Sequence, residues 1–434
     1  MGHNTPKEKI NFISLGCAKN LVDSEKLMGL LEASGYELTF ESSQTTAGIV
    51  IINTCGFIND AKEESVDNIL MQAALKKKGL IRQLLVMGCL SQRYKDDLIR
   101  EIPEIDAVFG VNDWENILKY IGKDSIPAGS VRHQTTPSHY AYLKIAEGCN
   151  RRCSFCIIPG IRGRHVSLPI DTLVDEARIL AKNGVKELIV VAQDTTYYGL
   201  DLYNKRRLAE LLMELSAIEE LEWIRLHYTY PVTFPADVLK LMARDPKICP
   251  YIDIPLQHIS NRILKSMNRG IDKEKTVKLI QKIRKTLPGA AIRTSFIVGY
   301  PGETLKEFNE LCSFINDMKF DRVGVFKYSH EEGTPAFKLR DTVPGKEKQR
   351  RMDLLMQLQR DIAEEINKNK INKVFTVLVD ENSHGACIAR TVYDSPEVDN
   401  EVIVNTKQKL HPGTFYKVKI TGADAYTLYA ELVN

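Results

Sequence analysis

Three cysteines close together near the middle of the chain restrict its fold and chemistry most. Cys149, Cys153 and Cys156 form a C-x3-C-x2-C run. Three thiolates at this spacing can hold three corners of an iron–sulfur cube, which normally takes four cysteines. The next cysteine along the chain is Cys249, so one iron would lack a protein thiolate and could bind a small molecule. The run therefore predicts a 4Fe–4S cluster with an open iron, which turns an electron carrier into a catalyst.

The same run allows other interpretations. Zinc would take a fourth Cys or His at ligand spacing, and His165 follows in the basic stretch Arg162-Gly163-Arg164-His165. Disulfides suit small secreted domains rather than a chain of this kind. Cysteines that only fill a core as small hydrophobic residues seldom cluster in this way. The spacing favours the cluster over these alternatives.

The composition is that of an ordinary soluble protein. A chain of 434 residues should hold two or three domains, and 44% hydrophobic and 26% charged residues are typical of globular proteins. No apolar run is as long as a membrane span, and residues 1–10 lack the apolar core of a signal peptide. Nine cysteines without a secretion signal indicate a reducing compartment. We expect a cytoplasmic protein with no membrane partner, and a net charge of +3 gives no strong preference for nucleic acid.

Residues 8–126 form the first predicted domain. Apolar runs that alternate with helical patterns predict a parallel sheet with covering helices. The expected strands are residues 10–15, 48–53, 83–87 and 107–109, and the expected helices include residues 24–34 and 60–78.

Each of the first three expected strands is followed, two residues later, by a cysteine. These are Cys17, Cys55 and Cys89, and each has a glycine beside it. The carboxyl ends of parallel strands meet at one edge of a sheet, where ligands bind, and glycine lets the backbone approach a bulky ligand. One such cysteine is usually an ordinary buried residue. Three in equivalent positions predict a second three-thiolate cluster site.

Residues 135–368 form the second predicted domain, after a linker broken by Pro127, Gly129 and Pro137. Six strand–helix units predict an incomplete barrel, short of the eight units of a closed one. The expected strands are residues 141–146, 187–192, 223–226, 251–254, 291–298 and 322–326. The Cys149 run lies just past the first of them, on the catalytic face of any such barrel.

Polar residues also follow the later strands of this domain. They are Gln193, Asp194, His227, His258, Gly299, Gly302 and Glu303. Each signal is weak by itself. The segment from Gly299 to Thr304 also fits a turn with a helix N-cap, and the histidines could be ordinary hydrogen-bonded residues. Cys249, Cys312 and Cys387 show no ligand spacing, and we expect them to be inert.

Residues 371–434 form the third predicted domain, which follows a charged helix over residues 346–370. Five short expected strands indicate a small β-barrel of the kind that often binds nucleic acid: residues 374–379, 386–391, 401–404, 415–420 and 427–432. The segment 371–434 holds six Lys or Arg and eight Asp or Glu, with acidic residues clustered at Asp394, Glu397, Asp399 and Glu401. A phosphate-backbone binder should be basic. The charge therefore favours a basic protein partner for this domain.

The order of these features resembles the radical S-adenosylmethionine (SAM) methylthiotransferases over nearly the whole chain, with a C-terminal barrel similar to their OB-like TRAM domain. One branch of that family modifies an adenosine in tRNA; the other modifies an aspartate of ribosomal protein uS12 in the small ribosomal subunit. Segments that resemble the second branch are SLGCAKNLVDSE (14–25), NTCGFINDAKEES (53–65), QDTTYYG (193–199), PLQH (255–258) and SPEVD (395–399).

The resemblance implies an enzyme with two 4Fe–4S clusters and SAM. The cluster at Cys149, Cys153 and Cys156 would cleave SAM to a radical that takes hydrogen from the β-carbon of the aspartate, a step beyond acid–base chemistry. The cluster at Cys17, Cys55 and Cys89 would supply a sulfur methylated by another SAM. SAM would be held near Phe155, Gln193, Asp194, Gly299, Gly302 and Glu303. The resemblance also implies a monomer and a flavodoxin- or ferredoxin-type electron donor.

Two other functions remain open at this point. The first is a methylthiotransferase that acts on a tRNA adenosine of the N6-isopentenyladenosine type. The second is an iron–sulfur scaffold or electron carrier, which would not cleave SAM.

Overall fold

The computed structural model describes residues 8–42, 47–123, 132–383 and 386–433. It divides into two compact units. Unit 1 comprises Met1–Thr136 and Ile157–Arg164, and unit 2 comprises Pro137–Cys156 and His165–Asn434. Within the described ranges, no helix is both long enough and apolar enough to cross a membrane.

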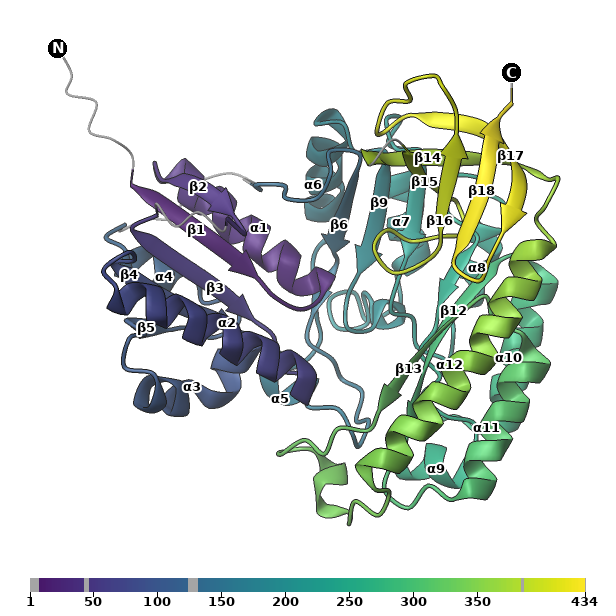
Figure 1. Cartoon of the computed structure of the whole chain (residues 1–434), viewed down its shortest axis with the longest axis horizontal. Helices are drawn as coiled ribbons and strands as arrows, with labels where there is room; N and C mark the ends of the chain where they lie inside the picture. Colours follow the sequence, from purple (N-terminus) through teal and green to yellow (C-terminus); the bar gives the residue numbers. More distant parts are fainter. Residues whose placement is uncertain (1–7, 43–46, 124–131, 384–385, 434) are drawn as a thin grey trace. The chain divides into compact units, whose positions relative to one another are not determined.

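Unit 1 contains a five-stranded parallel sheet with helices on both faces (Figure 1). The strands lie in the order β2 (Glu37–Phe40), β1 (Lys9–Ser14), β3 (Ile49–Thr54), β4 (Gln83–Gly88) and β5 (Ala107–Val108). Helices α1 (Ala18–Ala33) and α4 (Trp114–Tyr120) pack on the face that carries Phe12. Helices α2 (Asn59–Lys77) and α3 (Cys89–Glu101) pack on the face that carries Ile13. The alternation of side chains along β1 produces these two apolar layers.

The predicted parallel sheet of unit 1 is confirmed, with two differences. The edge strand β2 was not expected, and α1 begins at Ala18 rather than at residue 24. The short helix α5 (Ile158–Arg162) also belongs to unit 1, although it directly follows the Cys149–Cys156 run in sequence.

Unit 2 contains the six predicted parallel strands as an incomplete barrel. They form two three-stranded sheets, β6 (Tyr140–Lys144), β9 (Glu187–Val191) and β10 (Trp223–Leu226), then β11 (Tyr251–Asp253), β12 (Ala291–Val298) and β13 (Arg322–Lys327). Backbone hydrogen bonds from Ile224 N to Lys247 O (2.7 Å) and from Cys249 N to Ile224 O (2.9 Å) join β10 to the segment just before β11. The strand prediction is therefore confirmed, and the sheet is interrupted between β10 and β11.

Helices and short elements connect these strands. The longer helices are α6 (Ile170–Lys182), α7 (Leu208–Ser216), α8 (Ala236–Met242), α10 (Lys273–Thr286) and α11 (Leu305–Met318), whose apolar faces join one core with the strands. The short elements are β7 (Ala146–Glu147), β8 (Val166–Ser167), α9 (Asn261–Ser266) and the 3-10 turns η1 (Thr195–Tyr197) and η2 (Pro335–Lys338).

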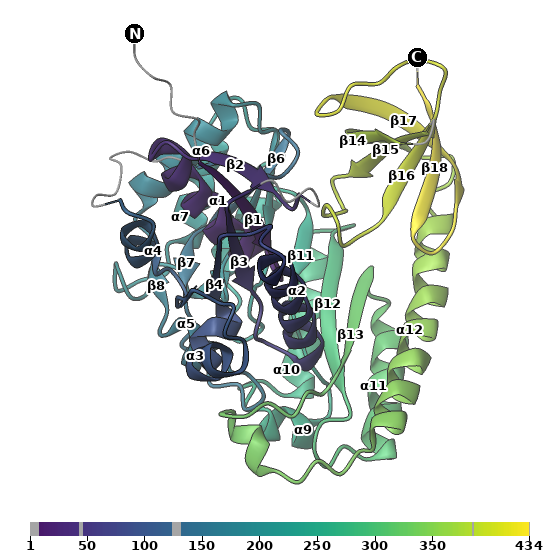
Figure 2. The same cartoon turned by 60° about the vertical axis from the view of Figure 1, so that its left-hand side comes forward.

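The long helix α12 (Gly345–Lys368) leads into a closed five-stranded barrel (Figure 2). Its strands are β14 (Val374–Ser383), β15 (Ala386–Thr391), β16 (Glu401–Asn405), β17 (Phe415–Ala423) and β18 (Thr427–Leu432), in the order β14-β15-β16-β18-β17. The predicted small barrel is confirmed, and we call it the C-terminal barrel.

The C-terminal barrel packs on the beginnings of the unit 2 strands. Trp223, Tyr251 and Ala291, the first residues of β10, β11 and β12, share an apolar cluster with Leu378 and Phe415 of the barrel. The Trp223 and Phe415 rings meet edge to face, 4.9 Å apart. The C-terminal barrel therefore covers the beginnings of the strands and not their carboxyl ends, which is where parallel sheets bind ligands.

Candidate functional site: two groups of three thiols

The structure brings Cys17, Cys55 and Cys89 together at the carboxyl edge of the unit 1 sheet, as predicted from the strand ends. A Cβ atom added to Gly16 would lie 3.1 Å from Cys55 Sγ, and one added to Gly56 would lie 2.9 Å from the carbonyl carbon of Cys89. The turns that carry the thiols are thus in contact, and Gly16, with φ of +98°, meets both the steric and the conformational need for glycine.

Two nearby cations act on these thiols. Burial alone would raise the pKa of Cys17, but Lys19, Arg162 and the backbone N–H groups that follow Cys17 bring that pKa below its ordinary value. Burial raises the pKa of Cys55, and it raises the pKa of Cys89 to about 11 against the opposing charge of Arg162. The guanidinium of Arg162 thus favours the thiolate form of all three cysteines.

In unit 2, the Cys149 run forms a tight loop after β6 and β7. Ser154 anchors this loop: its N–H donates to Met267 O at 3.0 Å, and its hydroxyl donates to Ser266 O at 2.8 Å. A backbone hydrogen bond of 3.1 Å from Cys156 N to Cys153 O turns the loop. The loop is therefore held by side-chain and backbone contacts of unit 2 itself.

Hydrogen-bond donors point at the sulfurs of this loop. Arg269 Nη1 donates to Cys153 Sγ at 3.2 Å, and the backbone N–H of Arg151 donates to Cys149 Sγ at 3.4 Å. Burial raises the pKa of Cys149 to about 11. The Cys149 thiol is therefore poorly ionised by itself, and a bound cation that holds it as a thiolate would reverse this balance.

The donor sets fit an iron–sulfur cluster better than a single metal ion. In the described part of the chain, no three His, Cys, Asp or Glu side chains are close enough together to hold one metal ion. A cluster spans the wider gaps between its thiolates, and N–H donors to the sulfurs tune it. The backbone N–H of His165 donates to Asn150 Oδ1 at 3.1 Å, beside the cysteine loop. Its ring has other neighbours: Nε2 contacts Ser167 Oγ at 3.1 Å, and the ring lies 4.9 Å from that of Tyr197. The structure gives no support to the zinc alternative.

Gln193 and Asp194 follow β9 and are both held by neighbours. Asp194 accepts from Thr196 N at 3.0 Å and forms an ion pair with Arg151 Nε at 2.7 Å. Gln193 Nε2 donates to Glu147 Oε1 at 2.8 Å, which leaves Gln193 Oε1 buried without a partner among the described residues. A buried carbonyl oxygen of this kind can accept a hydrogen bond from a ligand.

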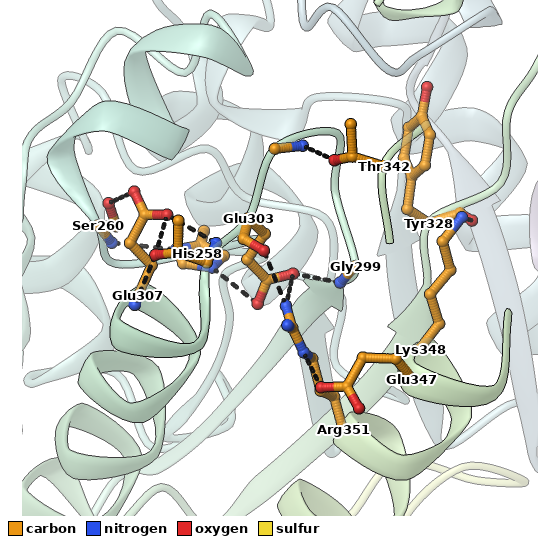
Figure 3. Close-up of polar contacts among 12 residues, drawn as sticks. His258, Ser260, Gly299, Glu303, Glu307, Tyr328, Thr342, Glu347, Lys348 and Arg351 are labelled. Atoms are coloured by element: carbon orange, nitrogen blue, oxygen red, sulfur yellow. Dashed lines mark hydrogen bonds and ion pairs between the residues drawn. The ribbon is translucent and has the colours of Figure 1, made fainter. Parts of the chain in front are cut away.

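Gly299, Gly302 and Glu303 form the turn between β12 and α11, and Figure 3 shows Gly299 and Glu303. Glu303 Oε2 accepts from Gly299 N, and Arg351 Nη1 lies 3.4 Å from the same oxygen. Gly299 has φ of +73°, and a Cβ atom there would lie 2.3 Å from Lys348 Cγ. The carboxylate of Glu303 is closed to solvent, so we expect it to shape this turn rather than to contact a ligand directly.

The next residue completes the turn as a helix N-cap. Thr304 Oγ1 accepts from Glu307 N at 3.3 Å, and Glu307 Oε2 accepts from Thr304 N at 2.9 Å, a reciprocal capping box at the start of α11. The predicted turn and helix N-cap are therefore confirmed.

The two predicted histidines have structural partners. His227 Nε2 lies 3.0 Å from Ser395 Oγ. His258 Nδ1 accepts from Ser260 N at 3.0 Å, so the neutral ring carries its proton on Nε2, which faces Glu303 Oε1 at 3.6 Å (Figure 3). Both histidines therefore fit the alternative of ordinary hydrogen-bonded residues.

Phe155 packs in a small apolar cluster with Tyr300 and Met267.

Most carboxylates of the acidic cluster of the C-terminal barrel form hydrogen bonds or ion pairs within unit 2. This corrects the inference that the acidic charge of the barrel favours a basic protein partner. Asp394 pairs with Arg322, and Glu397 Oε1 accepts from Tyr140 OH at 2.9 Å. Asp399 accepts from Tyr251 OH at 2.6 Å. Most of these carboxylates are therefore not available to a basic partner, and the formal charge of segment 371–434 does not choose between RNA and protein.

Four polar residues near the thiols were not predicted as site residues. They are Asn20, Arg151, Arg162 and Arg269. Arg151 lies over the Tyr230 ring at 4.0 Å, and its Nη2 is buried without a partner among the described residues. The basic stretch after the cysteine run was the one sequence signal for Arg162.

Comparisons with known proteins agree with the fold described above. Models of three families match the chain: the uncharacterized protein family UPF0004 over residues 9–110, the radical SAM superfamily over residues 143–315 and the TRAM domain over residues 371–433. The radical SAM methyltransferase TsrM from Kitasatospora setae, solved with cobalamin and a 4Fe–4S cluster, has a similar fold, with a TM-score of 0.55 and 16% identity over 76% of this chain and 77% of TsrM.

Two curated relatives are much more similar in sequence. The ribosomal protein uS12 methylthiotransferase RimO of Flavobacterium johnsoniae is 54% identical over 98% of each chain. RimO of Cytophaga hutchinsonii is 52% identical over 99% of this chain and 98% of the relative. The fold and the cysteine run thus define a radical SAM methylthiotransferase. The chain belongs to the RimO family of ribosomal protein uS12 methylthiotransferases.

Proposed function

We propose that this protein transfers a methylthio group to the β-carbon of an aspartate in ribosomal protein uS12. The observation that carries the proposal is the likeness to uS12 methylthiotransferases over 98% of the chain, together with two separate groups of three thiols. Neither the tRNA enzyme nor a simple electron carrier has a specific observation in its favour. The proposal defines a transferase of sulfur-containing groups.

The two groups of thiols would each hold one 4Fe–4S cluster. Cys149, Cys153 and Cys156 would hold the cluster whose open iron binds SAM, and Cys17, Cys55 and Cys89 would hold the auxiliary cluster. Bound SAM and clusters supply the radical and sulfur chemistry that acid–base side chains lack. The hydrogen bonds that the cysteine loop of unit 2 receives orient its sulfurs and offset their burial.

The side chains around the unit 2 loop would position SAM. Gln193 offers a buried carbonyl oxygen to a donor such as an ammonium group. Arg151 offers a buried N–H group to a carboxylate. Asp194 would orient Arg151, Phe155 would pack beside the last cysteine, and Gly299, Gly302 and Glu303 would shape the turn after β12.

The proposal includes a cytoplasmic monomer that receives electrons from a flavodoxin- or ferredoxin-type donor. Its domains would be residues 8–126, which hold the auxiliary cluster, residues 135–368, which bind SAM, and residues 371–434, the TRAM domain.

A substrate comparison tests the function. The reconstituted protein, SAM and a reductant are incubated in parallel with small ribosomal subunits and with tRNA, and both products are analysed by mass spectrometry. We expect a methylthio mass gain on uS12, located on an aspartate, and none on tRNA. A gain on tRNA alone would make the tRNA enzyme correct, and an absence of 5′-deoxyadenosine would favour the electron carrier.

A further inference from the structure

Arg162 lies among the N-terminal thiols, although it follows the other cysteine run in sequence. It ends helix α5, which belongs to unit 1, and its side chain is 2% exposed. Burying a guanidinium is costly unless charged and polar partners surround it. Its partners therefore indicate what this arginine is for.

The two ends of the guanidinium fork have different partners. Nη1 donates to Asp23 Oδ2 at 3.0 Å, and Nη2 donates to Asn20 Oδ1. The fork is also within hydrogen-bonding reach of the Cys89 thiol. One end is thus anchored on a carboxylate of α1, while the rest of the charge faces the thiols.

Asn20 fixes the direction of this charge. Its Nδ2 donates to Leu15 O at 2.9 Å and to Thr54 O at 3.1 Å, the carbonyls just before the turns that carry Cys17 and Cys55. The amide must therefore present Oδ1 on its other side, where it meets Arg162 and, at 3.6 Å, the Cys89 sulfur. The same asparagine that joins the thiol turns thus also positions the arginine.

We propose that Arg162 is a positioning residue for the auxiliary cluster and provides the fixed positive charge that this cluster faces. The inference rests on the proposed assignment of the auxiliary cluster to Cys17, Cys55 and Cys89. Three thiolates and their cluster carry net negative charge, and one-electron reduction adds another. The potential of such a cluster depends on net charge and on hydrogen bonds near its sulfurs. Arg162 therefore favours the reduced cluster and raises its reduction potential.

Only arginine can make both side-chain contacts seen at position 162, but any cation there would supply the positive charge that affects the potential. A planar fork can bind Asp23 at one end and Asn20 at the other, whereas a lysine ammonium is a point charge. Arg162→Lys loses the fork but keeps the positive charge, and because the potential depends on that charge it should stay close to that of the parent chain. Arg162→Met removes the charge and keeps much of the apolar volume, so it should shift the potential to more negative values.

The test uses the full chain with Cys149, Cys153 and Cys156 changed to Ala, so that one cluster gives the signal. Iron and sulfide contents are measured after reconstitution, and the midpoint potential is measured by a redox titration followed by electron paramagnetic resonance. We expect a more negative potential for Arg162→Met and a potential near that of the parent for Arg162→Lys. Equal potentials in the parent and the Met variant would overturn the proposal.

Arg132→Met is the matched control, because Arg132 is another buried arginine of unit 1 with a carboxylate partner, Glu25. It should leave the potential unchanged. If Arg162→Met holds no iron at all, the Lys variant decides: iron at the parent's level supports a charge role, and loss of iron overturns it. A parent chain without iron would instead contradict the cluster assignment itself, not the role of Arg162.

Discussion

Tyr251 donates a hydrogen bond of 2.6 Å to Asp399, and this contact joins the first residue of β11 to the loop between β15 and β16. Asp399 Oδ2 also accepts from Ser395 N at 2.9 Å, and its Oδ1 lies 3.5 Å from Arg293 Nε. The loop of the C-terminal barrel that carries the acidic cluster is thus bound to the strand beginnings of the incomplete barrel. In this protein those carboxylates hold two domains together.

Asp394 provides a direct test of that role. It pairs with Arg322, whose side chain is 9% exposed, and it also accepts from Thr391 Oγ1 at 2.5 Å. Asp394→Ala leaves a buried guanidinium without its nearest carboxylate, with only Asp399 remaining at 4.0 Å, which should lower the free energy of unfolding by roughly 3 kcal/mol. Urea denaturation of the full chain measures this loss.

The control for Asp394 is Glu431→Gln, on the exposed face of the same barrel. Surface changes of this kind usually stay within about 0.5 kcal/mol. Equal stability losses for the two variants would show that the acidic loop does not hold the barrel in place.

His227 should make the protein sensitive to mild acid. Burial lowers the pKa of His227 to about 3, against an ordinary value of 6.5. Between these values the unfolded chain binds a proton that the folded chain does not, so stability falls as the pH drops from about 6.5 toward 3. Well below pH 6.5 each pH unit costs about 1.4 kcal/mol, and the loss between pH 6.5 and 5 is about 1.6 kcal/mol because the unfolded histidine is already partly protonated at pH 6.5. Urea unfolding at both pH values, for the wild type and His227→Gln, should give a smaller pH difference for the variant.

An equal pH difference in the two proteins would mean that His227 is protonated in the folded state. The fully buried surroundings of the ring, stacked 5.5 Å from Tyr251, make that state costly.

The sequence predicted the six strands of unit 2 well. Residues 223–226 and 291–298 have the same bounds in the pattern and in the structure, although Arg225 and Arg293 interrupt their apolar runs. It missed β2 (Glu37–Phe40), a short edge strand whose residues are all at least partly exposed. It also started α1 too late, because Asn20 and Asp23 read as loop residues, whereas both are buried beside the thiols.

The grouping of the cysteines of the candidate site could be predicted, but their polar neighbours could not. Strand ends and local spacing place the six thiols, and these depend only on short segments of sequence. The contact of Arg162 with Asp23 joins residues 139 positions apart, and that of Arg390 with Glu187 joins residues 203 positions apart. No local sequence pattern shows which carboxylates will form such long-range pairs. The formal charge of the C-terminal barrel was therefore a poor guide to the kind of partner it binds.

Gln193 offers a test of SAM binding without turnover. Its Oε1 is buried and lacks a partner within the described ranges. If this oxygen accepts a hydrogen bond from SAM, Gln193→Leu should weaken SAM binding about tenfold, which corresponds to the ~1.4 kcal/mol of one polar contact. Equilibrium binding of SAM to the reconstituted protein measures the effect.

Gln359→Leu is the matched control, because Gln359 Nε2 likewise donates one hydrogen bond, in its case to Phe320 O at 2.9 Å, and its Oε1 is also buried without a described partner. Gln359 lies on α12 and contacts the chain just before β13 begins, not after a strand ends. The same loss of affinity in both variants would indicate a general packing effect rather than a SAM contact.

The two groups of thiols should separate two activities. Changing Cys17, Cys55 and Cys89 to Ala should remove roughly half of the iron and stop sulfur insertion, while SAM cleavage persists. Changing Cys149, Cys153 and Cys156 should remove the other half and abolish SAM cleavage. Iron assays, detection of 5′-deoxyadenosine and mass spectrometry of uS12 measure these outcomes in the same samples.

Cys312→Ala is the control for the thiol variants, because Cys312 packs against the core of unit 2 and should not bind iron. We expect its iron content and activity to match those of the wild type. Unchanged iron in the Cys17, Cys55 and Cys89 variant would contradict the auxiliary cluster, since the contact between their turns would then serve packing alone. Loss of SAM cleavage in that same variant, with half of the iron kept, would instead mean that the unit 2 cluster depends on unit 1 for its chemistry.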